Sequence, residues 1–286
     1  MNNGPAGHAA HSTVRPNAET GSRTPLRTFL RTSDGIPIDF VYEPGGVVYE
    51  SCADASAPLS GDPVFVVAHG FTGDADRPHV RRVARALARY GAVVTFSFRG
   101  HGASGGYSTV GDREVLDLAA VVERARGLGH ARVVTVGFSM GGSVVLRHAA
   151  LHRGDVDAVV SVSAPARWYY RGTAPMRRLH WLVTRPAGRL VGRYGFRTRI
   201  HRRHWDPVPL SPVEAVPRIA PVPLLVVHGD RDGYFPVDHP RMLAAAAGDH
   251  GELWLEPGMG HAEHAATDDL LARIGDWAVR AVGADG

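Results

Sequence analysis

The chain has 286 residues, a formal net charge of +4 and 44% hydrophobic residues, which is typical of a globular protein with one large domain or two small ones. A single cysteine, Cys52, excludes an internal disulfide and a cysteine metal cluster, and no apolar run approaches the roughly 18 residues of a membrane span. The polar first 24 residues lack the apolar region of a secretory signal. We therefore expect a cytoplasmic protein without a transmembrane segment and with a disordered tail over residues 1–25.

The charge is distributed unevenly along the chain. All 32 basic residues are arginine, and twelve of them fall between Ala164 and Ala220 beside only two acidic residues, which gives this stretch a net charge of +10. The remainder carries a net charge of −6. A basic insertion on an acidic body can attract anionic partners.

The first predicted elements form a β-hairpin. Two extended stretches, 28–32 and 36–42, are joined by the turn-forming pair Asp34-Gly35. Residues 47–49 predict another short strand, and the Ala-, Ser- and Pro-rich stretch 52–62 predicts a loop.

From residue 63 onward, buried-type strands alternate with helical patterns. The expected strands cover 63–68, 92–98, 133–136, 156–162, 223–228 and 252–255. The expected helices cover 78–90, 112–127, 143–152, 240–247 and 267–282. Short connections between such elements require right-handed crossovers, so we predict an α/β fold with a mostly parallel sheet.

The alternation breaks over residues 166–220, which are rich in Arg, Pro, Trp and Tyr and contain no buried-type strand. We interpret this stretch as a mostly helical cap. It is inserted into a sheet domain formed by residues 26–165 and 221–286.

One motif stands between a strand and a helix: Gly137-Phe138-Ser139-Met140-Gly141. In that context Gly-x-Ser-x-Gly forms a nucleophile elbow, with the serine hydroxyl exposed above the sheet. The alternative is a plain strand-to-helix turn that contains a serine. The elbow requires a base and an acid elsewhere, because a serine hydroxyl is a weak nucleophile until a base takes its proton.

Both partners are expected at the carboxyl ends of later strands, where open parallel sheets place their active sites. Asp230 and Asp232 follow the strand at 223–228. We favour Asp232 as the acid, because the following Gly233 permits a tight turn, and Asp230 as a cap of that turn. His261 follows the next strand through a glycine turn and is favoured over His264 as the base. The order Ser…Asp…His along the chain supports this set.

A tetrahedral intermediate also needs hydrogen-bond donors for its oxyanion. The backbone N–H of Met140 directly follows the nucleophile and opens a helix, where the dipole favours negative charge. The second donor is expected from the loop after the strand at 63–68, and we choose the N–H of Phe71. His69 in the same loop is interpreted as ordering it rather than acting as a base.

These motifs resemble those of the α/β-hydrolase family, close to its esterase and monoacylglycerol-lipase-like branch. The matching stretches are 69–71, 98–104, 137–142, 228–232 and 260–261. The resemblance implies an α/β-hydrolase fold, with a central sheet flanked by helices and a serine nucleophile, and it implies that Arg99 and His101 shape a loop rather than perform chemistry. Two positions depart from the pattern: Phe138, where many relatives carry histidine, and Ser97, where relatives often carry aspartate.

The expected cap offers two kinds of substrate contact. The aromatic residues Trp168, Tyr169 and Trp181 can line an apolar acyl pocket, and the pair Arg177-Arg178 can bind a carboxylate or phosphate. The alternatives are that the aromatic residues pack the cap onto the sheet domain and that the arginines form a solvated surface.

We therefore predict a serine hydrolase that cleaves a carboxylic ester or thioester through an acyl-enzyme. No metal or organic cofactor is implied, and the expected partner is a small-molecule substrate, with an anionic one among the options. Nucleic acid is not expected, because no recognition module is visible. Hydrolysis of an amide or C–C bond, or acyl transfer, would use the same residues, and a non-catalytic ligand-binding protein is the alternative from another class.

Overall fold

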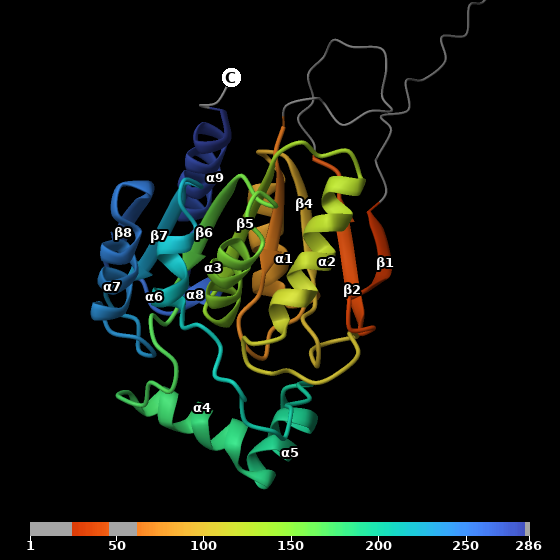
Figure 1. Ribbon diagram of the computed structural model, residues 1–286, viewed down its shortest axis with the longest axis vertical. Coiled ribbons are helices and arrows are strands. Elements are labelled where there is room, and N and C mark those ends of the chain that lie inside the picture. Colours follow the sequence, from red (N-terminus) through yellow and green to blue (C-terminus); the bar gives the residue numbers. More distant parts are fainter. Residues whose placement is uncertain (1–24, 46–61, 284–286) are drawn as a thin grey trace, which may run out of the picture.

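The computed structural model describes residues 25–45 and 62–283 (Figure 1). The predicted tail apart from Pro25, the predicted strand at 47–49, Cys52 and nearly all of the predicted loop at 52–62 lie outside the described residues. None of the described helices is long and apolar enough to cross a bilayer.

The centre of the molecule is an eight-stranded sheet with the strand order β1-β2-β4-β3-β5-β6-β7-β8. Strands β1 and β2 form the predicted hairpin, β2 runs antiparallel to β4, and every later pairing is parallel. The strands are β1 Leu26–Arg31, β2 Pro37–Glu43, β3 Val64–Ala68, β4 Ala92–Phe96, β5 Val133–Phe138, β6 Ala158–Val162, β7 Leu224–Gly229 and β8 Gly251–Glu256.

Helices cover both faces of this sheet (Figure 1). They are α1 Pro78–Leu87, α2 Glu114–Gly127, α3 Met140–Leu151, α4 Ala174–Thr184, α5 Pro186–Gly195, α6 Pro212–Ala215, α7 Asp238–Ala247, α8 Ala262–Ala265 and α9 Asp268–Gly283, with short 3₁₀ turns at Val216–Arg218 and Gly248–His250. Helix α3 begins three residues earlier than predicted. Gly141 and Gly142 have low helix propensity, so the first turn of this helix could not be predicted from the residue types alone.

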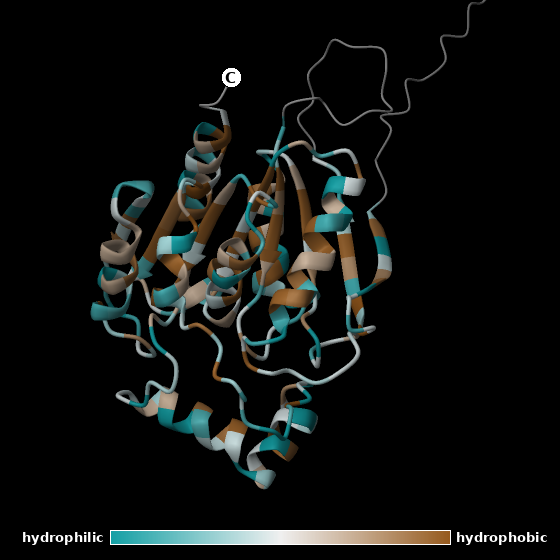
Figure 2. Ribbon diagram, viewed as in Figure 1, coloured by the Kyte–Doolittle hydropathy of each residue, from teal (hydrophilic) through white to brown (hydrophobic). Residues whose placement is uncertain are grey.

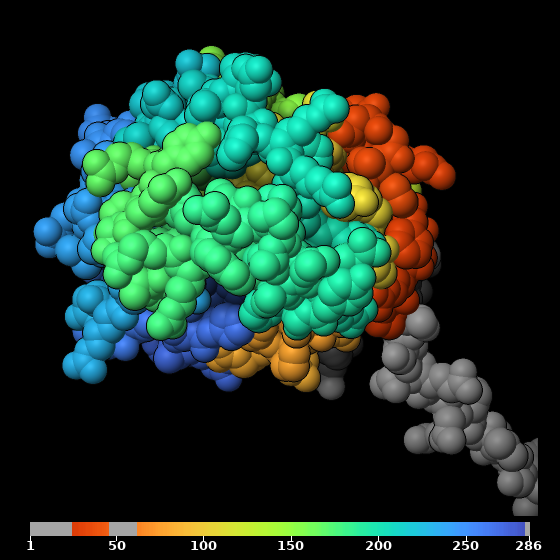
Figure 3. All heavy atoms as spheres, turned by 90° about the horizontal axis from the view of Figure 1, so that it is seen from below, coloured from red at the N-terminus to blue at the C-terminus, as the bar shows by residue number. Residues whose placement is uncertain are grey.

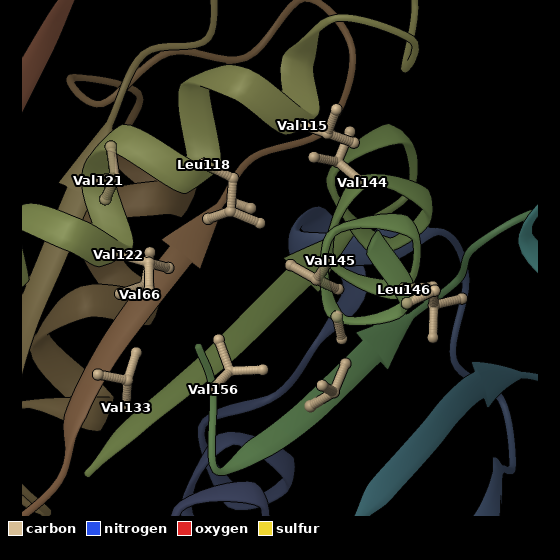
Figure 4. Packing of buried hydrophobic residues seen from close by; sticks show 14 of the residues in the cluster. Val66, Val115, Leu118, Val121, Val122, Val133, Val144, Val145, Leu146 and Val156 are labelled. Carbon is tan, nitrogen blue, oxygen red and sulfur yellow. The ribbon is translucent and has the colours of Figure 1, made fainter. Parts of the chain in front are cut away.

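The strands are apolar on both sides because the sheet has a core on each face. Along β3, Val64 and Val66 pack on one side and Phe65 and Val67 on the other. Helices α2 and α3 cover the first side, and α1 and α9 cover the second. Figure 4 shows part of the first core, with labelled side chains from β3, β5, α2, α3 and the loop before β6: Val66, Val133, Val115, Leu118, Val121, Val122, Val144, Val145, Leu146 and Val156.

Most of the segment 166–220 lies beyond the carboxyl edge of the parallel strands, at the bottom of Figure 1, whereas its end, from α6 on, packs against α3 and places Ala215, Val216 and Ile219 in the first core. It carries α4 and α5, which pack on each other, and apolar and polar residues alternate along both helices (Figure 2). Seen from below in Figure 3, its green to cyan atoms cover much of that edge. The chain therefore places a separate layer over the strand ends where the candidate site residues gather.

Among the described residues, one stretch of this segment forms β-bridges with the sheet domain. Thr198 bridges to His101 and Ile200 bridges to Ser108. The indole N–H of Trp205 donates to the Thr109 carbonyl at 2.7 Å. These contacts fix residues 198–205 on the glycine-rich loop after β4.

Candidate active site

Ser139 occupies a sharp turn between β5 and α3. Its backbone angles, φ 51° and ψ −112°, are strained for a residue with a side chain. The turn closes only with glycine on each side. A Cβ at Gly137 would lie 2.3 Å from the Gly141 carbonyl oxygen, and one at Gly141 would lie 2.1 Å from the Ala68 carbonyl oxygen. The elbow predicted from the sequence is therefore present in the backbone.

A chain of two hydrogen bonds runs from this serine through a histidine to a carboxylate. His261 Nε2 lies 2.9 Å from Ser139 Oγ, and His261 Nδ1 lies 2.8 Å from Asp232 Oδ2. An ionised carboxylate only accepts, so the Nδ1 proton is donated to Asp232 and Nε2 keeps its lone pair for the serine hydroxyl. The three residues come from the loops after β5, β7 and β8, which meet at one edge of the sheet.

Asp232 is held by the turn that follows it. Its Oδ1 accepts the N–H groups of Tyr234 at 2.8 Å and Phe235 at 3.1 Å, which leaves Oδ2 for His261. Burial would raise the pKa of this carboxyl, but the hydrogen bond from His261 and those two N–H groups bring its pKa below the ordinary value. The carboxylate is thus charged at neutral pH. Asp230 instead accepts the N–H of Gly258 at 2.7 Å and ties the β7 loop to the β8 loop.

Two contacts around His261 were not predicted from the sequence. The Tyr234 ring stacks on the imidazole with ring centres 4.1 Å apart. Ser163 Oγ accepts the N–H of Ala262 at 3.1 Å and so fixes the backbone beside the histidine. Ser163 ends the strand next to the elbow, and its position at a strand end was the one signal that could have found it. His264 lies on α8, and within the described chain no hydrogen bond joins it to Ser139.

The loop after β3 is held in place by two buried side chains, His69 and Glu263. His69 Nε2 accepts the N–H of Phe98 at 3.0 Å, so its Nδ1 donates to the Gly70 carbonyl at 2.7 Å. Burial lowers the pKa of His69 to about 3, which keeps it neutral. The buried carboxylate of Glu263 accepts the N–H of Gly70 at 3.1 Å. His69 therefore has the ordering contacts that the sequence led us to expect, and Glu263 adds an anchor that was not expected.

A second loop, the one after β4, is held by buried charge. Arg99, 3% exposed, contacts Asp117 at 2.7 Å and Asp34 at 2.8 Å. His101 Nδ1 lies 3.0 Å from the Arg99 carbonyl oxygen. Arg99 thus ties the loop to α2 and to the β1–β2 turn, His101 bonds within the loop, and neither side chain is hydrogen-bonded to Ser139 among the described residues, in keeping with the family resemblance.

A cavity of about 210 Å³ opens above Ser139 between the sheet edge and the segment 166–220. Phe71, Ser139 and Met140 form its floor, and the lining is mostly apolar. Helix α4 contributes side chains at the spacing i, i+3, i+4, i+7 and i+8, which is one helix face: Met176, Leu179, His180, Val183 and Thr184.

The structure places the five predicted substrate contacts differently. Trp168 and Tyr169 line the cavity. Arg177, Arg178 and Trp181 do not belong to its lining, because the turn of α4 directs them to another, exposed face of the helix. The expectation that they contact the substrate is therefore corrected. The spacing of the five lining residues on α4 was visible in the sequence and would have identified the right face.

The basic charge of the segment is largely unpaired. Among the described residues, Arg167 is the only one of its twelve arginines with a carboxylate within 4.0 Å, Asp238 at 3.3 Å. Arg167, Arg171 and Arg203 lie on the cavity lining. Three arginines thus add positive charge to the lining of a mostly apolar cavity.

Two clusters in the described part of the chain have metal-ligating groups close together. They are His79, Glu263 and His264 beside the β3 loop, and His148, His152 and Asp155 at the far end of α3. Neither cluster includes Ser139, Asp232 or His261.

The sheet order and the elbow define the α/β-hydrolase fold, and residues 63–180 match the family model described as alpha/beta hydrolase fold. The chain is 28% identical over 239 residues to a monoacylglycerol lipase of Mycolicibacterium smegmatis. The matched region covers 69% of this chain and 80% of that protein. Taken together, these findings show the α/β-hydrolase fold and a similarity of the chain to esterases and lipases.

Solved structures agree at the level of the fold. An esterase of Pyrococcus furiosus superposes with a TM-score of 0.68 and 23% identity, covering 91% of this chain and 92% of that one. The esterase domain of a Rhodothermus marinus protein superposes with a TM-score of 0.58 and 20% identity, covering 90% and 99%. The predicted α/β-hydrolase fold is confirmed.

Proposed function

We propose that the protein hydrolyses a carboxylic ester through an acyl-enzyme formed on Ser139. The observation that carries this proposal is the unbroken hydrogen-bond chain Ser139–His261–Asp232, which lies directly beneath an apolar cavity. The names of the similar proteins, a monoacylglycerol lipase and several esterases, support an ester as the substrate.

In the first step His261 Nε2 accepts the proton of Ser139 Oγ as that oxygen attacks the ester carbonyl. Asp232 stabilises the imidazolium that forms and holds the ring in the required tautomer. The imidazolium then donates its proton to the leaving alkoxide, which departs as the alcohol. A water molecule, deprotonated by the same nitrogen, attacks the acyl-enzyme and releases the acid.

The tetrahedral intermediate carries a negative oxygen that needs donors in place before the reaction. The N–H of Met140 is the first of α3, so no carbonyl of its own helix accepts it. Phe71 lies on the loop that Glu263 and His69 fix, and both residues share the cavity floor with Ser139. These positions support the N–H groups of Phe71 and Met140 as the oxyanion donors.

The segment 166–220 is proposed as the cap that binds the acyl or alcohol part of the substrate. The face of α4 that lines the cavity is apolar apart from His180 and Thr184, and burying an ester chain there is favourable by about 0.8 kcal/mol per CH₂. The three arginines on the cavity lining favour substrates with an anionic group over cationic substrates.

Replacing Ser139 by alanine tests the mechanism. We expect kcat for p-nitrophenyl esters to fall by at least about 10⁴-fold, because the acyl-enzyme cannot form. Ser33→Ala, in the exposed turn between β1 and β2, is the matched control and should keep full activity. Turnover in the Ser139 variant within tenfold of the wild type would refute the proposal.

Two further measurements separate the alternatives. A fluorophosphonate probe forms a P–O bond with an activated serine and releases fluoride, so mass spectrometry should find the adduct on Ser139. A non-catalytic binding protein would stay unlabelled. A series of p-nitrophenyl esters and matched anilides, run with and without an added alcohol acceptor, distinguishes ester hydrolysis from amide hydrolysis and acyl transfer.

A further inference from the structure

The carboxyl end of α3 brings three potential metal ligands together on the side of the molecule away from the proposed active site. His148 and His152 are four residues apart, which places both imidazoles on one helix face. Asp155 follows in the turn after the helix, and its Oδ2 lies 3.8 Å from His152 Nδ1. One ligand atom of each residue lies within 4.8 Å of the other two.

His148 is buried without hydrogen-bond partners. Its exposed fraction is 0%, and neither ring nitrogen has a partner among the described residues. A buried polar group that lacks a partner is costly, and such groups are rare in folded proteins. A neutral imidazole keeps one unprotonated ring nitrogen, whose lone pair is available to a ligand. A ligand that accepts this lone pair would remove the cost.

The cluster has access to solvent. A surface cleft of about 560 Å³ is lined by His152, Asp155 and Glu123. The nearby guanidinium of Arg126 is already paired with Asp157 at 2.7 Å, so its charge is countered. A cation can therefore reach His152 and Asp155 from the cleft, and the buried imidazole of His148 lies next to these two ligands.

We propose that His148, His152 and Asp155 form a binding site for a divalent transition metal, Zn²⁺ in particular. Two neutral imidazoles and one carboxylate are donors that Zn²⁺ prefers, and the cleft leaves a fourth position for water. The two rings now stack with centres 4.7 Å apart and planes at 14°. The side chain of His152 is 34% exposed and turns to direct its nitrogen to the metal, while His148 stays fixed in the core.

The second cluster is a weaker candidate and therefore serves as the internal control. Its carboxylate, Glu263, already accepts the N–H of Gly70 at 3.1 Å, and a metal there would compete with that bond. His264 belongs to this cluster and lies on the surface.

The test is a metal titration of the full chain without an affinity tag, after dialysis against a chelator. Zn²⁺ is titrated by calorimetry, and Co²⁺ is added as a spectroscopic probe whose visible absorption reports imidazole coordination. The variants are His152→Ala and Asp155→Asn, with His264→Ala as the control. Thermal melts in chelator establish that each variant folds as the wild type does.

We expect one equivalent of Zn²⁺ to bind to the wild type and to raise its Tm. Loss of one ligand should weaken Zn²⁺ binding at least tenfold, because even mutation of a residue that hydrogen-bonds to a metal ligand lowers metal affinity about tenfold or more. His152→Ala and Asp155→Asn should therefore lose the Tm increase and the Co²⁺ absorption, and His264→Ala should keep both. The proposal is overturned if the wild type shows no stoichiometric binding, if the two ligand variants bind as tightly as the wild type, or if His264→Ala alone abolishes binding.

Discussion

Asp232→Asn is the variant for which the structure makes the most detailed prediction. Asp232 Oδ1 accepts two backbone N–H groups, from Tyr234 and Phe235. In the variant the amide oxygen must keep that place, so the amide NH₂ group faces His261 Nδ1. As a donor it selects the tautomer with the proton on Nε2. That nitrogen then cannot accept the proton of Ser139.

The expected loss follows from this change of tautomer. A serine hydrolase with the wrong histidine tautomer loses about 10⁴-fold in kcat, which corresponds to about 5.5 kcal/mol of activation free energy. The assay is steady-state hydrolysis of p-nitrophenyl butyrate, with a thermal melt to show that the fold is kept. Asp230→Asn is the control, because Asp230 only accepts the N–H of Gly258. The reasoning fails if Asp232→Asn stays within tenfold of the wild type, and an inactive Asp230→Asn would move the acid to that residue.

Two further predictions concern the fold. Gly141→Ala should lower the free energy of unfolding by at least about 3 kcal/mol in urea titrations, because its Cβ would lie 2.1 Å from the Ala68 carbonyl oxygen. Gly127→Ala is the control and should be tolerated, because its Cβ would meet no atom within 4 Å. Equal stability of the two variants would contradict the predicted clash. The second prediction rests on three buried histidines whose pKa values burial lowers to about 3 or 4: His69, His101 and His148. Between these values and the unfolded value of about 6.5 the unfolded chain binds more protons, so stability is full above pH 6.5 and should fall by about 2 kcal/mol per histidine at pH 5. Urea titrations in chelator at pH 7.5 and pH 5 check this, and unchanged stability would argue against neutral buried rings.

The fold could be predicted from the sequence because its strands and helices alternate with short connections. The runs at 63–68 and 223–228 are too apolar for any position but a sheet buried on both faces, and the structure has β3 and β7 there. The strand-end placement of Ser139, Asp232 and His261 was also readable, because in a parallel sheet every strand end reaches the same edge.

What the sequence did not reveal depends on contacts between distant segments. The anchor from Glu263 to Gly70 joins residues 193 positions apart, and no local pattern marks it. The direction of α4 was missed for a different reason. Arg177, Arg178 and Trp181 were chosen for their residue types, whereas the lining of the cavity is decided by the helical period, which selects Met176 and Leu179.

The backbone pairing of residues 198–201 with the loop after β4 has a consequence for hydrogen exchange. The N–H groups of Ser108, Arg199 and His201 all bond across this junction, at 2.7–2.8 Å. Helices α4 and α5 pack on each other and have no such junction with the sheet domain. Their amides should therefore exchange with solvent deuterium through small local openings, while those at the junction exchange only when the larger body opens. Helices α4 and α5 are then attached to the sheet domain mainly through residues 198–201, and the exchange pattern along 174–201 would identify where the protected backbone begins.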